Sequence, residues 1–276
     1  MRRRHPGLDS PRSTFHRVPR VSLRGMYNVA MMEGLARPRH PEPGVELLSY
    51  YRELLEGFGP QGWWPARTRL EVILGAILTQ NTSWKNVRIA IRRLRRAGLL
   101  NQRRLGRASQ SELEEAIRPA GFFRQKARTI RHFVSWLDRS YGGSLHRMFR
   151  RPPEELRRAL LGIKGLGPET ADAILLYAGR KPFFVADGYT RRILARHELL
   201  RPRAGYEEAQ AYLHQHLPRD SGLFNEYHAL LVEVGKRYCK RSAPECAACP
   251  LEPWLPRRTE RAGLPTAATA RQGEWV

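Results

Sequence analysis

The sequence predicts an all-α protein, and three observations support this fold class. Apolar residues recur at helical spacing through most of the chain between residues 41 and 256. No segment sustains the alternation of apolar and polar residues that marks a half-buried strand. Glycine and proline interrupt the helical pattern at short intervals, as they do between packed helices. We therefore expect short helices joined by brief turns.

The apolar stripes give the main helices in chain order. Stripes of four to six residues lie within residues 47–58, 87–94, 206–213 and 223–234, and all their members are apolar or aromatic except Gln210 in the third. Each repeats every three or four positions, which places its members on one face of a helix. In the second stripe the residues between the apolar positions are mostly arginine. That helix is expected to turn a basic face outward.

The two ends of the chain lack this pattern. Residues 1–40 are rich in arginine and proline, hold few acidic residues and show no helical period, so we expect a basic disordered arm. An organelle transit peptide and a misassigned start remain open, since Met26, Met31 and Met32 follow. We expect a second disordered segment at residues 257–276.

Composition limits the classes of function. The 276 residues include 49 Lys plus Arg against 26 Asp plus Glu, which gives a formal charge of +23. Such a chain attracts polyanions, and nucleic acid is the commonest one. The apolar run Val72 to Leu78 is far shorter than the roughly 18 residues of a membrane span, so we expect no integral membrane protein. Three cysteines are too few for a secreted disulfide framework.

The segment from Leu160 to Ile174 predicts a hairpin between two helices. Gly162, Gly165 and Gly167 allow positive φ and close backbone approach, and Pro168 suits the first position of a new helix. Free N–H groups in such a hairpin, together with the helix N-terminus, suit one backbone phosphate without base recognition. An ordinary helix–turn–helix corner is the alternative.

Asp187 lies 18 residues after Glu169 and directly follows an apolar run. A helix is expected to start there, and aspartate is a favoured N-cap residue. A capping carboxylate that faces a cleft also serves catalysis, so the two interpretations are compatible.

The glycine hairpin followed by Asp187 resembles the helix-hairpin-helix glycosylase superfamily, the endonuclease III group of base-excision DNA repair enzymes. The segments Leu74 to Val87, Trp63-Trp64-Pro65 and Gly121 to Ala127 are similar to the branch that removes 3-methyladenine. The resemblance implies two helical lobes with a DNA-binding cleft between them. One lobe would contain residues 62–181, and the other residues 41–61 plus 182–256.

The resemblance also implies roles for individual residues. Asp187 matches the essential aspartate, and Gln80 matches the residue that fills the hole left by a flipped base. The remaining candidates are hairpin and base-pocket residues: Lys164, Gly165, Gly167 and Thr170 for DNA, and Trp63, Trp64, Trp84 and Glu169 for the base. The implied partner is double-stranded DNA with a damaged base, bound by a monomer in the cytoplasm, associated with the nucleoid.

The chain departs from bifunctional relatives at Glu169, where they carry a lysine. Schiff-base chemistry requires an amine, so we expect a monofunctional glycosylase unless Lys164 reaches the sugar. An oxidised-pyrimidine glycosylase with lyase activity and a non-catalytic DNA-binding module are the alternatives.

Cys239, Cys246 and Cys249 match three ligands of the iron–sulfur loop common in endonuclease III relatives, and Leu255 stands where the fourth cysteine is expected. A [4Fe-4S] cluster with an incomplete or foreign fourth ligand and a relic loop without metal are both open. Zinc with a distant histidine such as His228 is a third interpretation.

Overall fold

The computed structural model describes residues 42–256 and confirms the all-α fold class over that range. The arm expected at 1–40 and the tail expected at 257–276 lie outside the described residues. The elements are helical in every case: α1 (Pro43–Phe58), α2 (Arg69–Leu78), α3 (Trp84–Arg96), α4 (Gln102–Arg107), α5 (Gln110–Ile117), η3 (Arg118–Ala120), α6 (Phe123–Tyr141), α7 (Leu145–Phe149), α8 (Pro153–Leu161), α9 (Pro168–Ala173), η4 (Ile174–Ala178), α10 (Gly188–Arg196), α11 (Tyr206–His216), α12 (Ser221–Arg237), η5 (Cys246–Ala248) and η6 (Glu252–Trp254).

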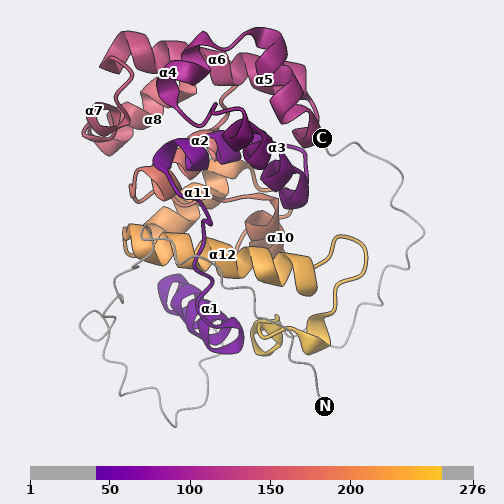
Figure 1. Ribbon diagram of the computed structural model, residues 1–276. Coiled ribbons are helices and arrows are strands. Elements are labelled where there is room, and N and C mark those ends of the chain that lie inside the picture. The colour runs from indigo at the N-terminus through magenta and orange to yellow at the C-terminus, as the bar shows by residue number, and fades with distance from the viewer. Residues whose placement is uncertain (1–41, 257–276) are drawn as a thin grey trace, which may run out of the picture.

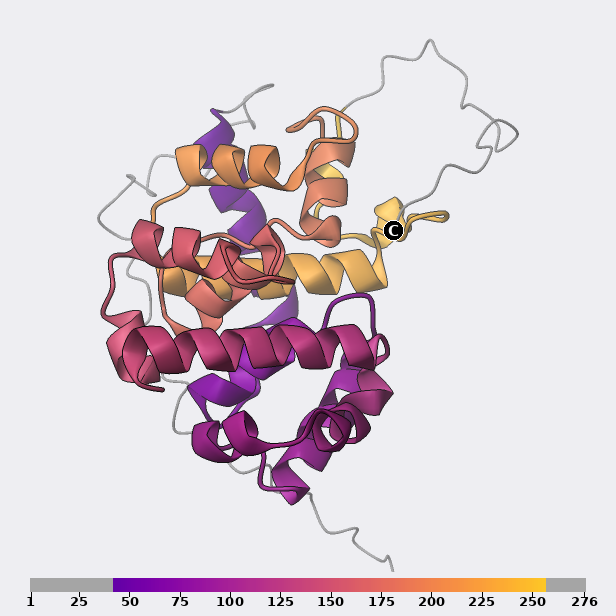
Figure 2. The same ribbon diagram turned by 90° about the horizontal axis from the view of Figure 1, so that it is seen from above.

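The helices gather in two groups that meet along α2, α9 and η4. In Figure 1, α4 to α8 lie at one end of the molecule, and α1, α12 and the C-terminal segment 239–256, which contains the three cysteines, lie at the other. α12 packs against α1 and α10, while α6 packs against α2, α4 and α5. Figure 2 shows the axes of the long helices α6 and α12 nearly aligned in that view. The lobe boundaries near residues 62 and 182 stay a prediction.

Helix starts follow capping rules that the sequence carries. Thr68 Oγ1 accepts a hydrogen bond from the amide of Glu71 at 3.2 Å, and Asp220 Oδ1 accepts one from Leu223 at 2.7 Å. Pro168 begins α9, as expected, because its missing N–H would have no helical partner at that position. None of the helices within residues 42–256 combines the length and apolar character that crossing a bilayer demands.

α2 is the central helix of the fold. Every residue from Leu70 to Leu78 is buried, and the helix contacts α3, α6, α9 and η4. Gly75 is required here because a Cβ atom would lie 2.9 Å from Cζ2 of Trp64. The end of α2 therefore presents Gln80 from a rigid position.

α9 continues into a π-helical turn, η4, which holds Tyr177 among otherwise buried apolar residues. A π-helical turn adds one residue to the helical repeat and occurs often at functional sites. η4 contacts both α2 and α12, so Tyr177 lies between the two groups of helices.

Candidate active site and nucleic-acid interface

Asp187 ends the buried segment Phe183–Ala186 and is the N-cap of α10. Its Oδ1 accepts a hydrogen bond from the amide of Thr190 at 2.8 Å, which confirms the expected cap. The side chain keeps 16% of its surface exposed. The carboxylate is fixed by the cap and stays partly open, and its catalytic role stays a prediction.

The other oxygen of Asp187 faces His228 of α12. His228 Nε2 lies 3.6 Å from Asp187 Oδ2, and the Tyr177 hydroxyl hydrogen-bonds His228 Nδ1. Burial and the negative charge of Asp187 raise the pKa of Tyr177, so its hydroxyl stays protonated and donates a hydrogen bond to Nδ1. Nε2 then presents its hydrogen to Asp187. The choice of His228 as a zinc ligand is wrong, because this histidine lies at the aspartate and does not line the cavity that Cys239, Cys246 and Cys249 share.

The pKa values of two carboxyl groups at this site, Asp187 and Glu169, are shifted in opposite directions. Burial alone would raise the pKa of Asp187, but His228 and the hydrogen bond from the Thr190 amide outweigh it and leave that pKa lowered. Burial and the negative charge of Asp187 raise the pKa of Glu169, against opposing contributions from His228, Arg191 and Gln80. Asp187 is thus held ionised while Glu169 retains a proton more readily, a separation typical of acid–base pairs.

Gln80 connects the end of α2 with the first turn of α9. Its Nε2 donates to Thr170 Oγ1 at 2.9 Å, and the Gln80 side chain lies near enough to Glu169 to lower the pKa of that carboxyl. The next residue, Asn81, has a φ of 51°, in the left-handed region that asparagine tolerates better than most residues. The structure therefore brings three predicted site residues, Gln80, Glu169 and Thr170, into one contact group.

Three tryptophans form an aromatic cluster with Tyr177. The ring centroids of Trp64 and Trp84 are 4.9 Å apart, those of Trp63 and Trp84 5.4 Å, and those of Trp64 and Tyr177 5.1 Å. Trp64 is buried, whereas Trp63 and Trp84 are half-buried. Because Tyr177 also bonds His228, the tryptophan cluster is continuous with Asp187.

The hairpin between α8 and α9 places its backbone on the surface. Only Gly165 has a positive φ, of 94°, and a Cβ there would lie 2.2 Å from Thr129 Oγ1. Gly162 and Gly167 have φ values of −72° and −88°, so the expected conformational need applies to one glycine of the three. The amides of Gly165 and Gly167 have no hydrogen-bond partner within residues 42–256. Lys164 is exposed and forms no ion pair within the same range.

Phe122 is a surface feature to which the sequence interpretation gave no role. It is 65% exposed, the highest value for a large apolar side chain in residues 42–256, and it holds a left-handed φ of 45°. Lys126 Nζ donates to the carbonyls of Ala120 at 2.8 Å and Leu78 at 2.9 Å, and burial lowers its pKa to about 8. These bonds fix the Phe122 turn beside the end of α2 that carries Gln80.

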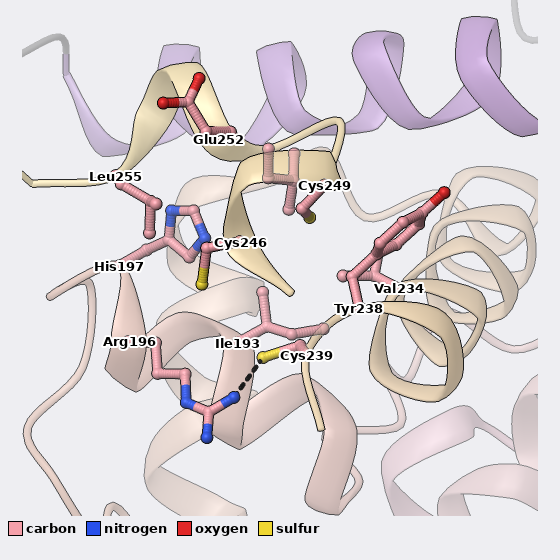
Figure 3. A pocket seen from close by; sticks show the side chains of 11 residues that line it. Ile193, Arg196, His197, Val234, Tyr238, Cys239, Cys246, Cys249, Glu252 and Leu255 are labelled. Carbon is pink, nitrogen blue, oxygen red and sulfur yellow. Dashed lines mark hydrogen bonds between the residues drawn. The ribbon is translucent and has the colours of Figure 1, made fainter. Parts of the chain in front are cut away.

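The three cysteines line one cavity below the C-terminal loop (Figure 3). Leu255 lines it as well and offers no ligand atom. Within residues 42–256, no three His, Cys, Asp or Glu side chains are grouped closely enough to hold a single metal ion. The [4Fe-4S] cluster that the cysteine spacing suggests therefore stays a prediction.

Comparison with known proteins identifies the family. Residues 74–219 match the HhH-GPD superfamily of base excision DNA repair proteins. A protein of Methanocaldococcus jannaschii, named among the DNA repair glycosylases, is 42% identical over 73% of this chain and 92% of its own length. Endonuclease III of Thermotoga maritima is 31% identical over 64% of this chain and 78% of its own length.

Solved structures share the fold. The H. pylori 3-methyladenine DNA glycosylase bound to 1,N6-ethenoadenine is 26% identical, with a TM-score of 0.62 over 71% of this chain and 98% of its own. An endonuclease III–DNA covalent intermediate has a TM-score of 0.66 at 22% identity, over 77% of this chain and 95% of its own. The chain thus belongs to the HhH-GPD superfamily of base excision DNA repair proteins, as an endonuclease III-related DNA glycosylase.

Proposed function

We propose that this glycosylase removes an N-alkylated purine from duplex DNA and leaves the strand intact. The proposal rests on the connection of Asp187 to the tryptophan cluster through His228 and Tyr177. In addition, Glu169 stands at the position where strand cleavage would need an amine. The H. pylori relative that binds 1,N6-ethenoadenine supports the choice of an alkylated purine.

The tryptophan cluster suits a cationic base. A purine alkylated on a ring nitrogen carries positive charge, and an aromatic face attracts a cation by roughly 0.5–2 kcal/mol. Trp63 and Trp84 are half-buried, so a flipped base would complete the cluster by stacking. Lys236 Nζ lies 5.8 Å from the centre of the Trp63 ring and shows that this ring already accepts a cation.

Asp187 supplies the negative charge that the reaction needs. Breaking the bond between base and sugar develops oxocarbenium character at C1′, which a nearby carboxylate stabilises. The lowered pKa of Asp187 keeps it ionised at neutral pH. The same carboxylate then orients the water that attacks C1′ and accepts its proton.

Glu169 acts on the leaving base. Its raised pKa favours the protonated form, which donates a hydrogen bond to a purine nitrogen as the bond breaks. A carboxyl group forms no Schiff base with the sugar, so β-elimination has no nucleophile at this position. Lys164, the other amine considered, projects from the hairpin on the surface.

DNA binding would use the hairpin and the turns beside Gln80. The free amides of Gly165 and Gly167 suit one phosphate. Gln80 and Phe122 stand on adjacent turns, so an amide and an apolar wedge would enter the gap left by the flipped base. We propose that one chain acts alone on double-stranded DNA, in the cytoplasm and on the nucleoid.

A duplex oligonucleotide with a single 3-methyladenine tests the proposal. We expect free base, an intact strand that breaks only in alkali, and no adduct after borohydride treatment. Strand cleavage without alkali would show a lyase, and binding without base release would show a non-catalytic module. Parallel duplexes with 1,N6-ethenoadenine and an oxidised pyrimidine define the lesion, and preference for the pyrimidine would contradict the proposal.

A further inference from the structure

The cysteine cavity has three sulfur donors and one apolar side chain where the sequence pattern predicts a fourth sulfur. Cys239, Cys246 and Cys249 line it together with Leu255. Arg196 Nη1 donates to Cys239 Sγ at 3.1 Å (Figure 3). A complete four-ligand set therefore requires a donor from elsewhere in the chain.

His197, at the end of α10, also lines this cavity and is 9% exposed. Its Nδ1 lies 3.2 Å from the carbonyl oxygen of Trp254 and 3.0 Å from the hydroxyl of Tyr50. The Tyr50 hydroxyl donates its own hydrogen to Glu46 Oε1 at 2.6 Å, so it accepts from the histidine. A carbonyl oxygen only accepts, and Nδ1 must therefore carry the hydrogen.

The other ring nitrogen of His197, Nε2, consequently carries a lone pair that is free to accept. In a neutral imidazole with hydrogen on Nδ1, Nε2 is the acceptor, and it has no hydrogen-bond partner within residues 42–256. Figure 3 shows the ring of His197 beside Cys246, with one nitrogen on the side of that cysteine. A backbone carbonyl that holds one nitrogen and leaves the other bare is the arrangement found around metal-bound histidine.

We propose that Nε2 of His197 is the fourth ligand of a [4Fe-4S] cluster bound by Cys239, Cys246 and Cys249. A single zinc ion draws its ligands to within about 2.0–2.3 Å of one point, and no such tight group exists within residues 42–256. A cubane cluster takes one ligand at each of four separate irons, so its ligands stand further apart. This inference is independent of the base that the glycosylase removes.

The exchange of ligands has an electronic consequence. A neutral imidazole in place of a thiolate removes one negative charge from the cluster and its ligands. Lower negative charge raises the reduction potential of an iron–sulfur cluster. Arg196 beside Cys239 acts in the same direction. The cluster should therefore be reduced more easily than one held by four cysteines on the same loop.

Metal analysis of the full chain, purified without oxygen, is the first test. We expect about four irons and four acid-labile sulfides per chain. Pulsed EPR of the reduced protein labelled with 15N-histidine should show a nitrogen coupled to the cluster. Zinc in place of iron, the absence of metal, or a cluster without histidine coupling would each overturn the proposal.

Paired variants place the ligand at His197. His197→Ala should lose most of its iron and the histidine coupling, while His197→Ala with Leu255→Cys should regain iron, remain uncoupled and show a lower reduction potential. His146→Ala, a change at an exposed histidine, should match the unchanged protein. Iron content and coupling retained in His197→Ala would contradict the assignment. If His197→Ala fails to fold, coupling in the unchanged chain and the potential of the double variant still decide the question.

Discussion

His228 Nε2 lies 3.6 Å from Asp187 Oδ2 and joins the middle of α12 to the N-terminus of α10. Asp187 already caps α10 through the Thr190 amide, so its two oxygens have different partners. Tyr177 holds the far side of the imidazole. The Asp187 carboxylate is thus held by the Thr190 amide of α10 and by His228 of α12, which Tyr177 of η4 holds in turn. Its charge is therefore in position before any substrate binds.

Replacing Asp187 by asparagine should separate its two roles. The amide side chain of the Asp187→Asn variant retains an oxygen for the Thr190 N–H, so we expect the melting temperature to stay close to that of the unchanged protein. The single-turnover rate of base release should fall by roughly 100- to 1000-fold, since a preorganised charge is lost. Excision that survives within about tenfold, at unchanged DNA affinity, would reduce Asp187 to a helix cap.

Replacing His228 by alanine should alter the pH profile of excision. His228 lowers the pKa of Asp187, so its loss should raise that pKa. As pH is lowered, Asp187 is then protonated at a higher pH than in the unchanged protein. The acidic limb of the rate profile should therefore shift to higher pH. Tyr177→Phe keeps the imidazole but removes its partner hydroxyl, and we expect a smaller shift. An acidic limb that stays in place in both variants would show that His228 does not act through Asp187.

Replacing Glu169 by glutamine should affect the basic limb and the stability. The raised pKa of Glu169 means that the rate should decline as pH rises through it, and this decline should vanish in the glutamine variant. A carboxyl with a raised pKa in the folded state stabilises fully below its unfolded pKa, about 4.3, and loses that contribution as pH rises through the folded value. Glu169→Gln should therefore melt higher than the unchanged protein at neutral pH, with the difference shrinking near pH 4. An unchanged basic limb would exclude Glu169 as the acid.

The sequence predicted the local features of this site better than its long-range contacts. The N-cap at Asp187 and the start of α9 at Pro168 follow from residue types at adjacent positions, and both are confirmed. The partnership of His228 with Asp187 joins residues 41 positions apart in the chain, across two helices, and periodicity carries no information about it. The choice of His228 as a zinc ligand was wrong for that reason.

Tyr177 and Phe122 show two further limits. The π-helical turn that carries Tyr177 packs between α2 and α12, and no residue type in the sequence predicts such a turn. The exposure of Phe122 follows from the left-handed turn after Gly121, whereas an apolar residue in a sequence is first expected in the core. The Gly-Phe-Phe order was the available signal, because a glycine before two aromatics permits such a turn.

Gly165 and Gly167 offer a matched test of the phosphate site. Gly165→Ala adds a Cβ at a φ of 94° that would lie 2.2 Å from Thr129 Oγ1, so the hairpin must change shape. Gly167→Ala adds one where no atom lies within 4 Å, at an ordinary φ of −88°. We expect Gly165→Ala to lose roughly 1–2 kcal/mol of stability. It should also bind DNA more weakly, by the same factor for undamaged and damaged duplexes.

The salt dependence of binding tests whether the lost affinity of Gly165→Ala comes from a lost phosphate contact. Each phosphate contact contributes a slope of about 0.9 to the plot of log affinity against log salt. If the hairpin holds one phosphate, Gly165→Ala should lower the slope by about this amount, while Gly167→Ala keeps the slope of the unchanged protein. Because a phosphate contact carries no base information, lesion preference should be the same in all three proteins. A Gly165→Ala variant with a normal slope but altered lesion preference would place the hairpin in base recognition instead.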